Sequence, residues 1–320
     1  MKKISILLLI TVALSSCYDD YIKDFEYTST YFTYQTDVRS IVVGEDHFFQ
    51  FGVVLGGVRQ NNTDREVSYV IDPTLINPST LALLKAGNQK AAMNSVSVLK
   101  MLPESYYELS DPSKFVIKAG EHMGTVKLTV NNNFLSDIAT SAPNYAIPVR
   151  IIQAGDSILP SKNYTVIAIK YENMLFGNYW HGGVTTRDSA GVAVKPVTYY
   201  TQIPSADALA WALTTSGLNS LTTNGVGAKS SSAKPEIKLM LNDDGKIILS
   251  EVTGATYQVL PDGESTFNKA KLLQNRKIFL NYKYQDAGGI WYHAKDTLTF
   301  RNRIRDGFNE WEDENPEHYK

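Results

Sequence analysis

Hydrophobic and polar residues alternate in short runs along most of the chain. From residue 31 to residue 171 these runs are rich in aromatic and β-branched residues, with turn-forming residues between them. This pattern is typical of short β-strands joined by turns. We expect strands at residues 31–34, 40–43, 48–55, 67–71, 105–109, 115–118, 125–130, 146–152 and 164–171. Residues 78–100 break the pattern with leucine, alanine and lysine, which favours a short helix or an insertion. So many short strands indicate a two-sheet antiparallel sandwich, and we predict an immunoglobulin-like domain over residues 31–172.

The pattern restarts after residue 172. Residues 237–241 and 246–250 flank Asn242–Gly245, a strong hairpin signal, and two long runs follow at 277–285 and 290–301. Antiparallel neighbours on short turns are typical of an up-and-down barrel. We predict such a barrel over residues 173–320. Within it, residues 205–216 are expected to form a short amphipathic helix that packs Trp211 into the core.

The first strand of this second half carries Gly177, Tyr179 and Trp180. A glycine followed by an aromatic residue and a tryptophan resembles the opening of lipocalin-like (calycin-like) barrels. The resemblance implies that Trp180 plugs the closed end of the barrel. The fold class that follows is all-β: an N-terminal immunoglobulin-like sandwich, then a C-terminal lipocalin-like antiparallel β-barrel.

The chain begins with a targeting segment. Two lysines precede the apolar run Ile4–Leu14, and small residues lead to Cys17, so we predict a signal peptide over residues 1–16. The run is too short for a spanning helix, which needs about 20 residues. Leu14–Cys17 resembles the lipobox of bacterial lipoproteins, which implies that Cys17 is lipidated and that residues 17–30 form a tether. Asp19 and Asp20 resemble an export signal to the outer face of the outer membrane. We therefore expect a lipid-anchored, surface-exposed outer-membrane protein that meets the membrane through its anchor alone.

Three blocks in the first domain carry a further resemblance. They are Tyr31–Phe32, Phe51–Gly57, and Leu102–Tyr107 followed by residues 115–120. Over residues 30–170 the chain resembles the N-terminal domain of unknown function shared by many Bacteroidetes surface lipoproteins. That domain is similar to the immunoglobulin-like spacers of surface glycan-binding proteins and is encoded in polysaccharide-utilisation loci. The resemblance implies a glycan as ligand and SusC/SusD-like transporter proteins as further partners.

Composition limits the possible partners. The chain has 31 basic and 33 acidic residues, so no net field attracts nucleic acid, and we expect no nucleic-acid partner. Its single cysteine excludes an internal disulfide. Hydrophobic residues make up 43% of the sequence, which suffices for two cores stabilised by burial.

Residue types that perform chemistry are sparse. The five histidines are far apart and Cys17 is the sole cysteine, so we expect no metal site and no cofactor. No Gly-x-Ser-x-Gly motif occurs. Glycoside hydrolysis requires two carboxylates at a fixed separation, a condition that a chain with 33 acidic residues leaves open. The second half is, however, too short for a catalytic (β/α)₈ barrel of about 250 residues. We predict that the protein is not an enzyme, with a hydrolase-related protein as the less favoured alternative.

The last long strand holds the candidate binding residues. Alternation places Trp291, His293 and Lys295 on one face of it. The opposite, apolar face consists of Ile290, Tyr292, Ala294, Leu298 and Phe300. An exposed indole beside polar groups can stack on a sugar ring, and Trp311 in the tail either joins this site or covers Trp291. Burial of Trp291 against the other domain is an equally good interpretation. We predict a non-catalytic, cell-surface lipoprotein that binds an oligo- or polysaccharide, and the alternative is a scaffold subunit of an outer-membrane complex.

Overall fold

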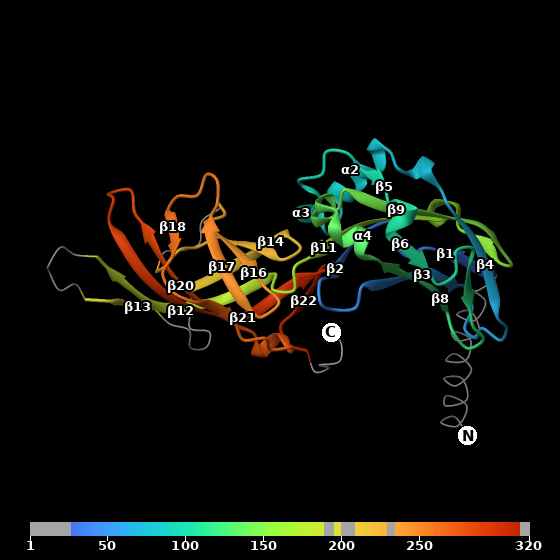
Figure 1. Cartoon of the computed structure of the whole chain (residues 1–320). Helices are drawn as coiled ribbons and strands as arrows, with labels where there is room; N and C mark the ends of the chain where they lie inside the picture. The colour runs from blue at the N-terminus through green and yellow to red at the C-terminus, as the bar shows by residue number, and fades with distance from the viewer. Residues whose placement is uncertain (1–26, 189–194, 200–208, 229–233, 314–320) are drawn as a thin grey trace, which may run out of the picture.

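The computed structural model describes residues 27–188, 195–199, 209–228 and 234–313. Two β-rich lobes lie side by side in the molecule (Figure 1). The sheets of the first lobe end at Glu172, and the sheet of the second begins at Gly177. The all-β class with a barrel in the second half, predicted from the sequence, is confirmed. The predicted signal peptide, Cys17 and most of the predicted tether lie outside the described residues.

The first lobe is a sandwich of two sheets. One sheet has the order β10 (Ser157–Ile158), β1 (Ser29–Tyr31), β3 (Phe48–Gly56), β8 (Met123–Val130), β6 (Tyr107–Leu109). The other has the order β2 (Thr36–Val42), β11 (Tyr164–Glu172), β9 (Tyr145–Ala154), β4 (Arg65–Ile71), β7 (Lys114–Ile117), with β5 (Lys100–Met101) beside β9. Because β2 is an edge strand, its outer backbone groups need a partner from elsewhere.

Aromatic side chains from both sheets fill the sandwich core. Phe115 is fully buried and meets Phe32 and Phe51 edge to face, with ring centroids 5.8 and 5.7 Å apart. Helices α2 (Pro78–Ala86) and α3 (Lys90–Met93) lie in the stretch predicted to be helical. They cover the outer face of the second sheet, where Val166 and Ala168 are buried. Strand β11 is therefore apolar on both faces over its central residues Val166–Ile169, as expected for a strand that is covered on both sides.

The second lobe is a closed barrel of eight antiparallel strands. In order around the barrel they are β12 (Gly177–Arg187), β14 (Leu209–Gly217), β15 (Ser220–Thr223), β16 (Ile237–Leu241), β17 (Lys246–Glu251), β19 (Ser265–Phe267), β20 (Lys277–Gln285) and β21 (Trp291–Arg305). Pairing of β12 with β21 closes the barrel. At Gly183, where φ is 154°, a Cβ would lie 2.2 Å from the carbonyl oxygen of Lys295, so glycine permits this close approach. Three short strands are added: β13 (Val197–Tyr199) beside β12, β18 (Gln258–Pro261) beside β20, and β22 (Phe308–Glu310) beside the end of β21.

Two local predictions for the barrel are wrong. Residues 209–217 form strand β14 rather than a helix, because Trp211 and Leu213 are buried at every second position. Trp211 nevertheless packs in the core, as expected. Trp180 does not plug the barrel: it faces outward beneath the guanidinium of Arg301, 4.4 Å from the ring centroid. Its neighbour Tyr179 points inward, because successive side chains of a strand face opposite sides.

The barrel interior is packed with aromatic side chains around one carboxylate. Asp296 accepts hydrogen bonds from the hydroxyls of Tyr282, at 2.5 Å, and Tyr199. His181 Nε2 lies 3.1 Å from the same carboxylate, and the His181 ring stacks on Trp211 with centroids 3.7 Å apart. Burial is the main cause of the raised pKa of both tyrosines, and the Asp296 charge adds to it. This cluster is thus a structural centre of the barrel.

Candidate functional site

Three of the predicted binding residues share one face of β21. Trp291, His293 and Lys295 point outward, whereas Ala294 and Asp296 point into the barrel. Trp291 is partly buried, and Lys283 on the neighbouring strand places its ammonium 5.1 Å from the ring centroid. One face of the indole thus already has a cationic neighbour.

Two carboxylates hold the imidazole of His293. Its Nδ1 lies 2.5 Å from Asp262 and its Nε2 lies 3.0 Å from Asp188. The hydrogen bond with Asp262 raises the pKa of His293 above its ordinary value, and Asp188 contributes further. Because both ring nitrogens are engaged, His293 has no remaining donor for a ligand hydroxyl in this arrangement.

Trp311 belongs to another part of the molecule. It follows β22 (Phe308–Glu310), which pairs with the far end of β21 at Arg303. Eleven residues of extended strand separate Trp291 from Asn302, a distance of about 35 Å. The indole of Trp311 is 57% exposed. The structure therefore brings Trp291, His293 and Lys295 together and separates Trp311 from them, and Trp311 does not cover Trp291.

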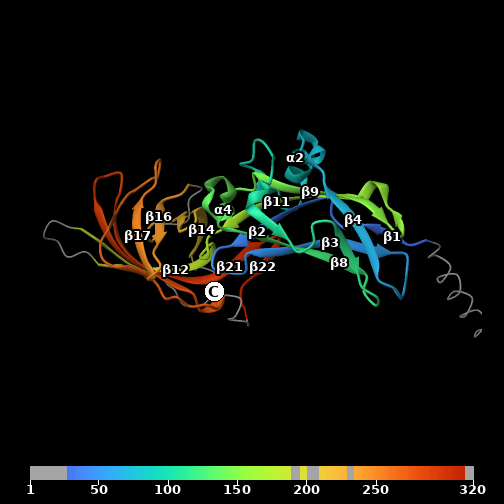
Figure 2. The ribbon, with the colours of Figure 1, turned by 45° about the vertical axis from the view of Figure 1, so that its right-hand side comes forward.

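A hairpin from the barrel reaches the edge of the sandwich. Strands β21 and β22 turn at Asp306 and Gly307, whose φ values of 54° and 85° suit a tight Asp-Gly hairpin. Asp306 accepts a hydrogen bond of 2.7 Å from the backbone N–H of Ser40 on edge strand β2, and its carboxylate lies 3.6 Å from Arg39. Burial raises the pKa of Asp306. Figures 1 and 2 both place β22 close to β2, so the hairpin joins the two lobes.

A buried ionic cluster fixes this junction. Arg303, which is 1% exposed, donates to both oxygens of Glu45 at 2.7 and 3.1 Å and to Glu310 at 2.5 Å. Arg305 donates to Glu45 at 2.8 Å and to Glu310 at 2.9 Å. Burial alone would lower the pKa of Arg303, but its bonds to Glu45 and Glu310 outweigh that effect and raise it. Glu45 belongs to the sandwich, whereas the other three residues of the cluster belong to the second lobe. The cluster therefore holds the two lobes in one orientation.

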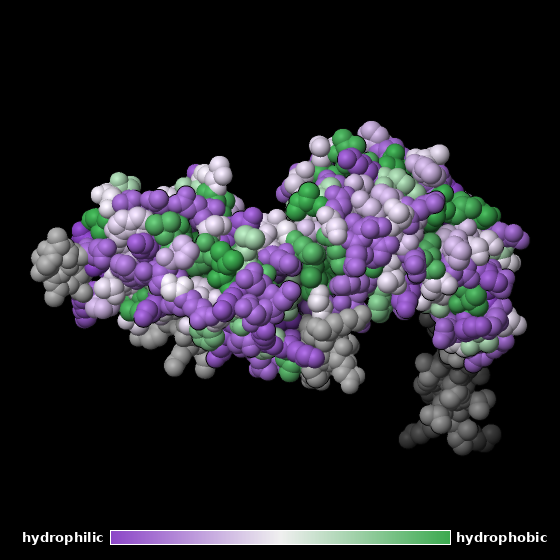
Figure 3. All heavy atoms as spheres, viewed as in Figure 1, coloured by the Kyte–Doolittle hydropathy of each residue, from purple (hydrophilic) through white to green (hydrophobic). Residues whose placement is uncertain are grey.

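Two adjoining pockets lie along this junction, and we call them together the junction groove. The first has a volume of about 270 Å³ and is lined by β2, the loop between α2 and α3, and the hairpin tip. The second, of about 370 Å³, is lined by β2, the loop after it, and residues 305–313. Both are near the lower end of the range of about 300–1,000 Å³ for small-molecule sites, which often lie between domains. The view in Figure 3 shows hydrophilic residues gathered where β21 and β22 leave the barrel.

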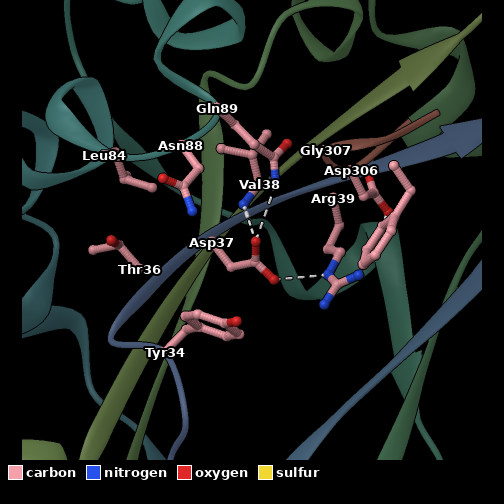
Figure 4. A pocket seen from close by; sticks show the side chains of 12 residues that line it. Tyr34, Thr36, Asp37, Val38, Arg39, Leu84, Asn88, Gln89, Asp306 and Gly307 are labelled. Atoms are coloured by element: carbon pink, nitrogen blue, oxygen red, sulfur yellow. Dashed lines mark hydrogen bonds and ion pairs between the residues drawn. The ribbon is translucent and has the colours of Figure 1, made fainter. Parts of the chain in front are cut away.

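The first pocket combines an exposed ring with ordered polar groups. Asp37 accepts hydrogen bonds from its neighbour's backbone N–H at 2.9 Å and from Gln89 Nε2 at 3.1 Å, and it pairs with Arg39 at 2.8 Å. Burial raises the pKa of Asp37, although Arg39 opposes the rise. Figure 4 shows Asn88 and Gln89 on one side of Asp37 and the ring of Tyr34 on the other. The Tyr34 side chain is 64% exposed, so its ring is accessible beside a preorganised polar network.

Sequence reasoning did not find the junction groove. The walls of its first pocket come from residues 34–39, 84–89 and 306–308, which only the folded chain brings together. The one available signal was the Asp306-Gly307 turn near the end of a strongly alternating strand, but no pattern indicated where that turn docks. No group of His, Cys, Asp and Glu suited to a metal occurs among the described residues.

Comparisons with known proteins agree with this fold. A family model described as an N-terminal domain matches residues 18–158. No curated protein matches the sequence. A crystal structure of a Bacteroides ovatus protein of unknown function is similar with a TM-score of 0.67 and 21% identity, covering 90% of this chain and 98% of that one. A second Bacteroides ovatus structure of unknown function has a TM-score of 0.48 and 18% identity, covering 89% of this chain and 100% of that one. The first similarity shows the shared fold.

Helix length gives one further result. Among the described residues, no helix is both long enough and apolar enough to cross a membrane.

Proposed function

We propose that the protein is a cell-surface lipoprotein that binds an oligo- or polysaccharide in the junction groove and does not cleave it. The observation that carries the proposal is the exposed ring of Tyr34 beside the network of Asp37, Arg39 and Gln89. Sugars present apolar C–H faces and a rim of hydroxyls. An aromatic ring next to fixed carboxylate, amide and guanidinium groups matches both.

The lipid anchor at Cys17 and the surface location complete this proposal. A protein held by acyl chains at the outer membrane could present the groove to external glycan, with SusC/SusD-like transporters as partners for uptake. Replacing Cys17 with alanine should abolish incorporation of radiolabelled palmitate. Protease treatment of intact cells should remove the wild-type protein. Protection until the cells are lysed would contradict the surface location.

A glycan array probed with the mature chain tests binding directly. We expect saturable retention of at least one glycan, with no release of reducing ends over time. Retention of no glycan would refute the proposal, and release of shorter fragments would favour the hydrolase alternative.

Paired variants locate the site. Tyr34→Ala should weaken retention by about tenfold, the loss expected when one stacking contact is removed. Tyr27→Ala is a matched control, because Tyr27 is 77% exposed and lies outside the groove. Trp291→Ala tests the other candidate surface, at Trp291, His293 and Lys295. Loss of binding in that variant alone would move the site to the barrel face.

A further inference from the structure

We infer that the junction groove takes an extended, uncharged glycan chain of two or more sugar units laid across Phe308, and that it rejects chains carrying uronate or sulfate groups. This inference rests on the proposed function and specifies its ligand.

The two pockets share part of their lining at the hairpin tip. Arg39, Asp306 and Phe308 line both of them. Phe308 is 71% exposed although it is a large apolar side chain, so its ring is available at the border between the pockets. A ligand that occupies both pockets would contact this residue in each of them. With Tyr34 in the first pocket, the groove then offers two aromatic contacts along one path, which suits a chain better than a single sugar.

The charge of the lining selects against anions. Six carboxylates line the two pockets: Asp37, Glu45, Asp46, Asp306, Glu310 and Asp313. Among the described residues, two guanidinium groups, those of Arg39 and Arg305, line them as well. Both are already paired with carboxylates of the groove. Even when the buried Arg303 behind the groove is counted, the acids exceed the bases by three in the part of the lining that the structure describes.

This excess has opposite effects on neutral and acidic glycans. Sugar hydroxyls can donate hydrogen bonds to carboxylates, and such charge-assisted bonds are stronger than neutral ones. A uronate or sulfate group cannot donate in this way and is repelled by the same oxygens. The groove therefore favours neutral chains by attraction and disfavours acidic chains by repulsion.

Titration calorimetry on the mature chain tests both parts of the inference. The probes are neutral gluco-, manno- and xylo-oligosaccharides from monosaccharide to hexasaccharide, and oligogalacturonates of the same lengths. In the neutral series that binds, we expect the tetrasaccharide to bind at least about tenfold more tightly than the monosaccharide. An oligogalacturonate of equal length should bind at least about tenfold more weakly than the neutral chain, with a smaller gap at high salt.

Variants assign each effect to its cause. In Phe308→Ala, the affinity for neutral glycans should no longer increase with chain length. The melting temperature should stay unchanged, because the side chain is exposed. The double variant Asp46→Asn with Asp313→Asn should reduce the difference in affinity between neutral and acidic chains. Glu108→Gln, an exposed acid outside the groove, should alter neither effect.

The outcomes separate this inference from the proposed function. Equal affinity for monosaccharide and tetrasaccharide would overturn the extended path. Oligogalacturonate binding as tight as that of neutral chains would overturn the charge selection. In both cases a glycan still binds, whereas the failure of every neutral and acidic probe to bind would refute the proposed function itself.

Discussion

The buried cluster at the junction makes a quantitative prediction. Glu45→Gln removes a carboxylate that accepts two hydrogen bonds from Arg303 and one from Arg305. Removing one partner of a buried ion pair typically costs about 3–5 kcal/mol, because the remaining charge stays desolvated. Glu310 still pairs with Arg303, and glutamine keeps one acceptor oxygen. We therefore expect the free energy of unfolding to fall by about 3 kcal/mol, near the lower end of that range.

Urea unfolding followed by tryptophan fluorescence measures this loss. The matched control is Glu121→Gln, an exposed acid of the first lobe, which should stay within about ±0.5 kcal/mol of the wild type. The double variant of Glu45→Gln with Arg303→Met should lose less than the sum of the two single variants, because the second change removes the charge that the first leaves unpaired. A loss below about 1 kcal/mol for Glu45→Gln, or simple additivity in the double variant, would show that the cluster does not couple the lobes.

Three further predictions concern the barrel. Because the pKa of His293 is raised, its imidazolium stabilises the fold below about pH 6.5, and this contribution is lost as the pH rises through the folded-state pKa. His293→Gln should therefore lower the melting temperature slightly at acid pH and leave it unchanged at alkaline pH, and equal curves at all pH values would contradict this. Trp211→Ala should cost about 3–5 kcal/mol in urea unfolding, since the indole is fully buried, and a near-wild-type midpoint would be inconsistent with that burial. Trp291→Ala should leave the melting temperature nearly unchanged, because its side chain faces outward, whereas a large fall would identify it as a core residue.

Much of the fold could be predicted because alternation and turn residues are local signals. The hairpin at Asn242–Gly245 and the outward face of Trp291, His293 and Lys295 follow from period-two patterns. The strand at residues 209–217 was mistaken for a helix because alanine and leucine favour helices in isolation, while pairing with β12 determined the outcome. Trp180 was misplaced because one residue of offset along a strand exchanges the two faces.

Less of the candidate site could be predicted from the sequence. Asp306 contacts Ser40 across 266 positions of the chain, and Arg303 contacts Glu45 across 258. No local periodicity encodes such pairings, because the partners lie in different lobes and far apart in the sequence. Tyr34 and Phe308 are far apart in the sequence and line one pocket only in the folded chain.

The barrel closes with residues that precede the β21–β22 hairpin, whereas the groove needs the hairpin itself. The ladder between β12 and β21 already ends at the pair Asn178–Asn302. A chain interrupted after Asn302 would therefore keep every pair that closes the barrel, yet it would lack Arg303, Asp306 and Phe308. During synthesis the groove is among the last features to form, after both lobes have most of their strands. Nonsense and frameshift changes in this short stretch should yield protein that still contains the closed barrel but lacks the ionic contacts between the lobes and one wall of the groove.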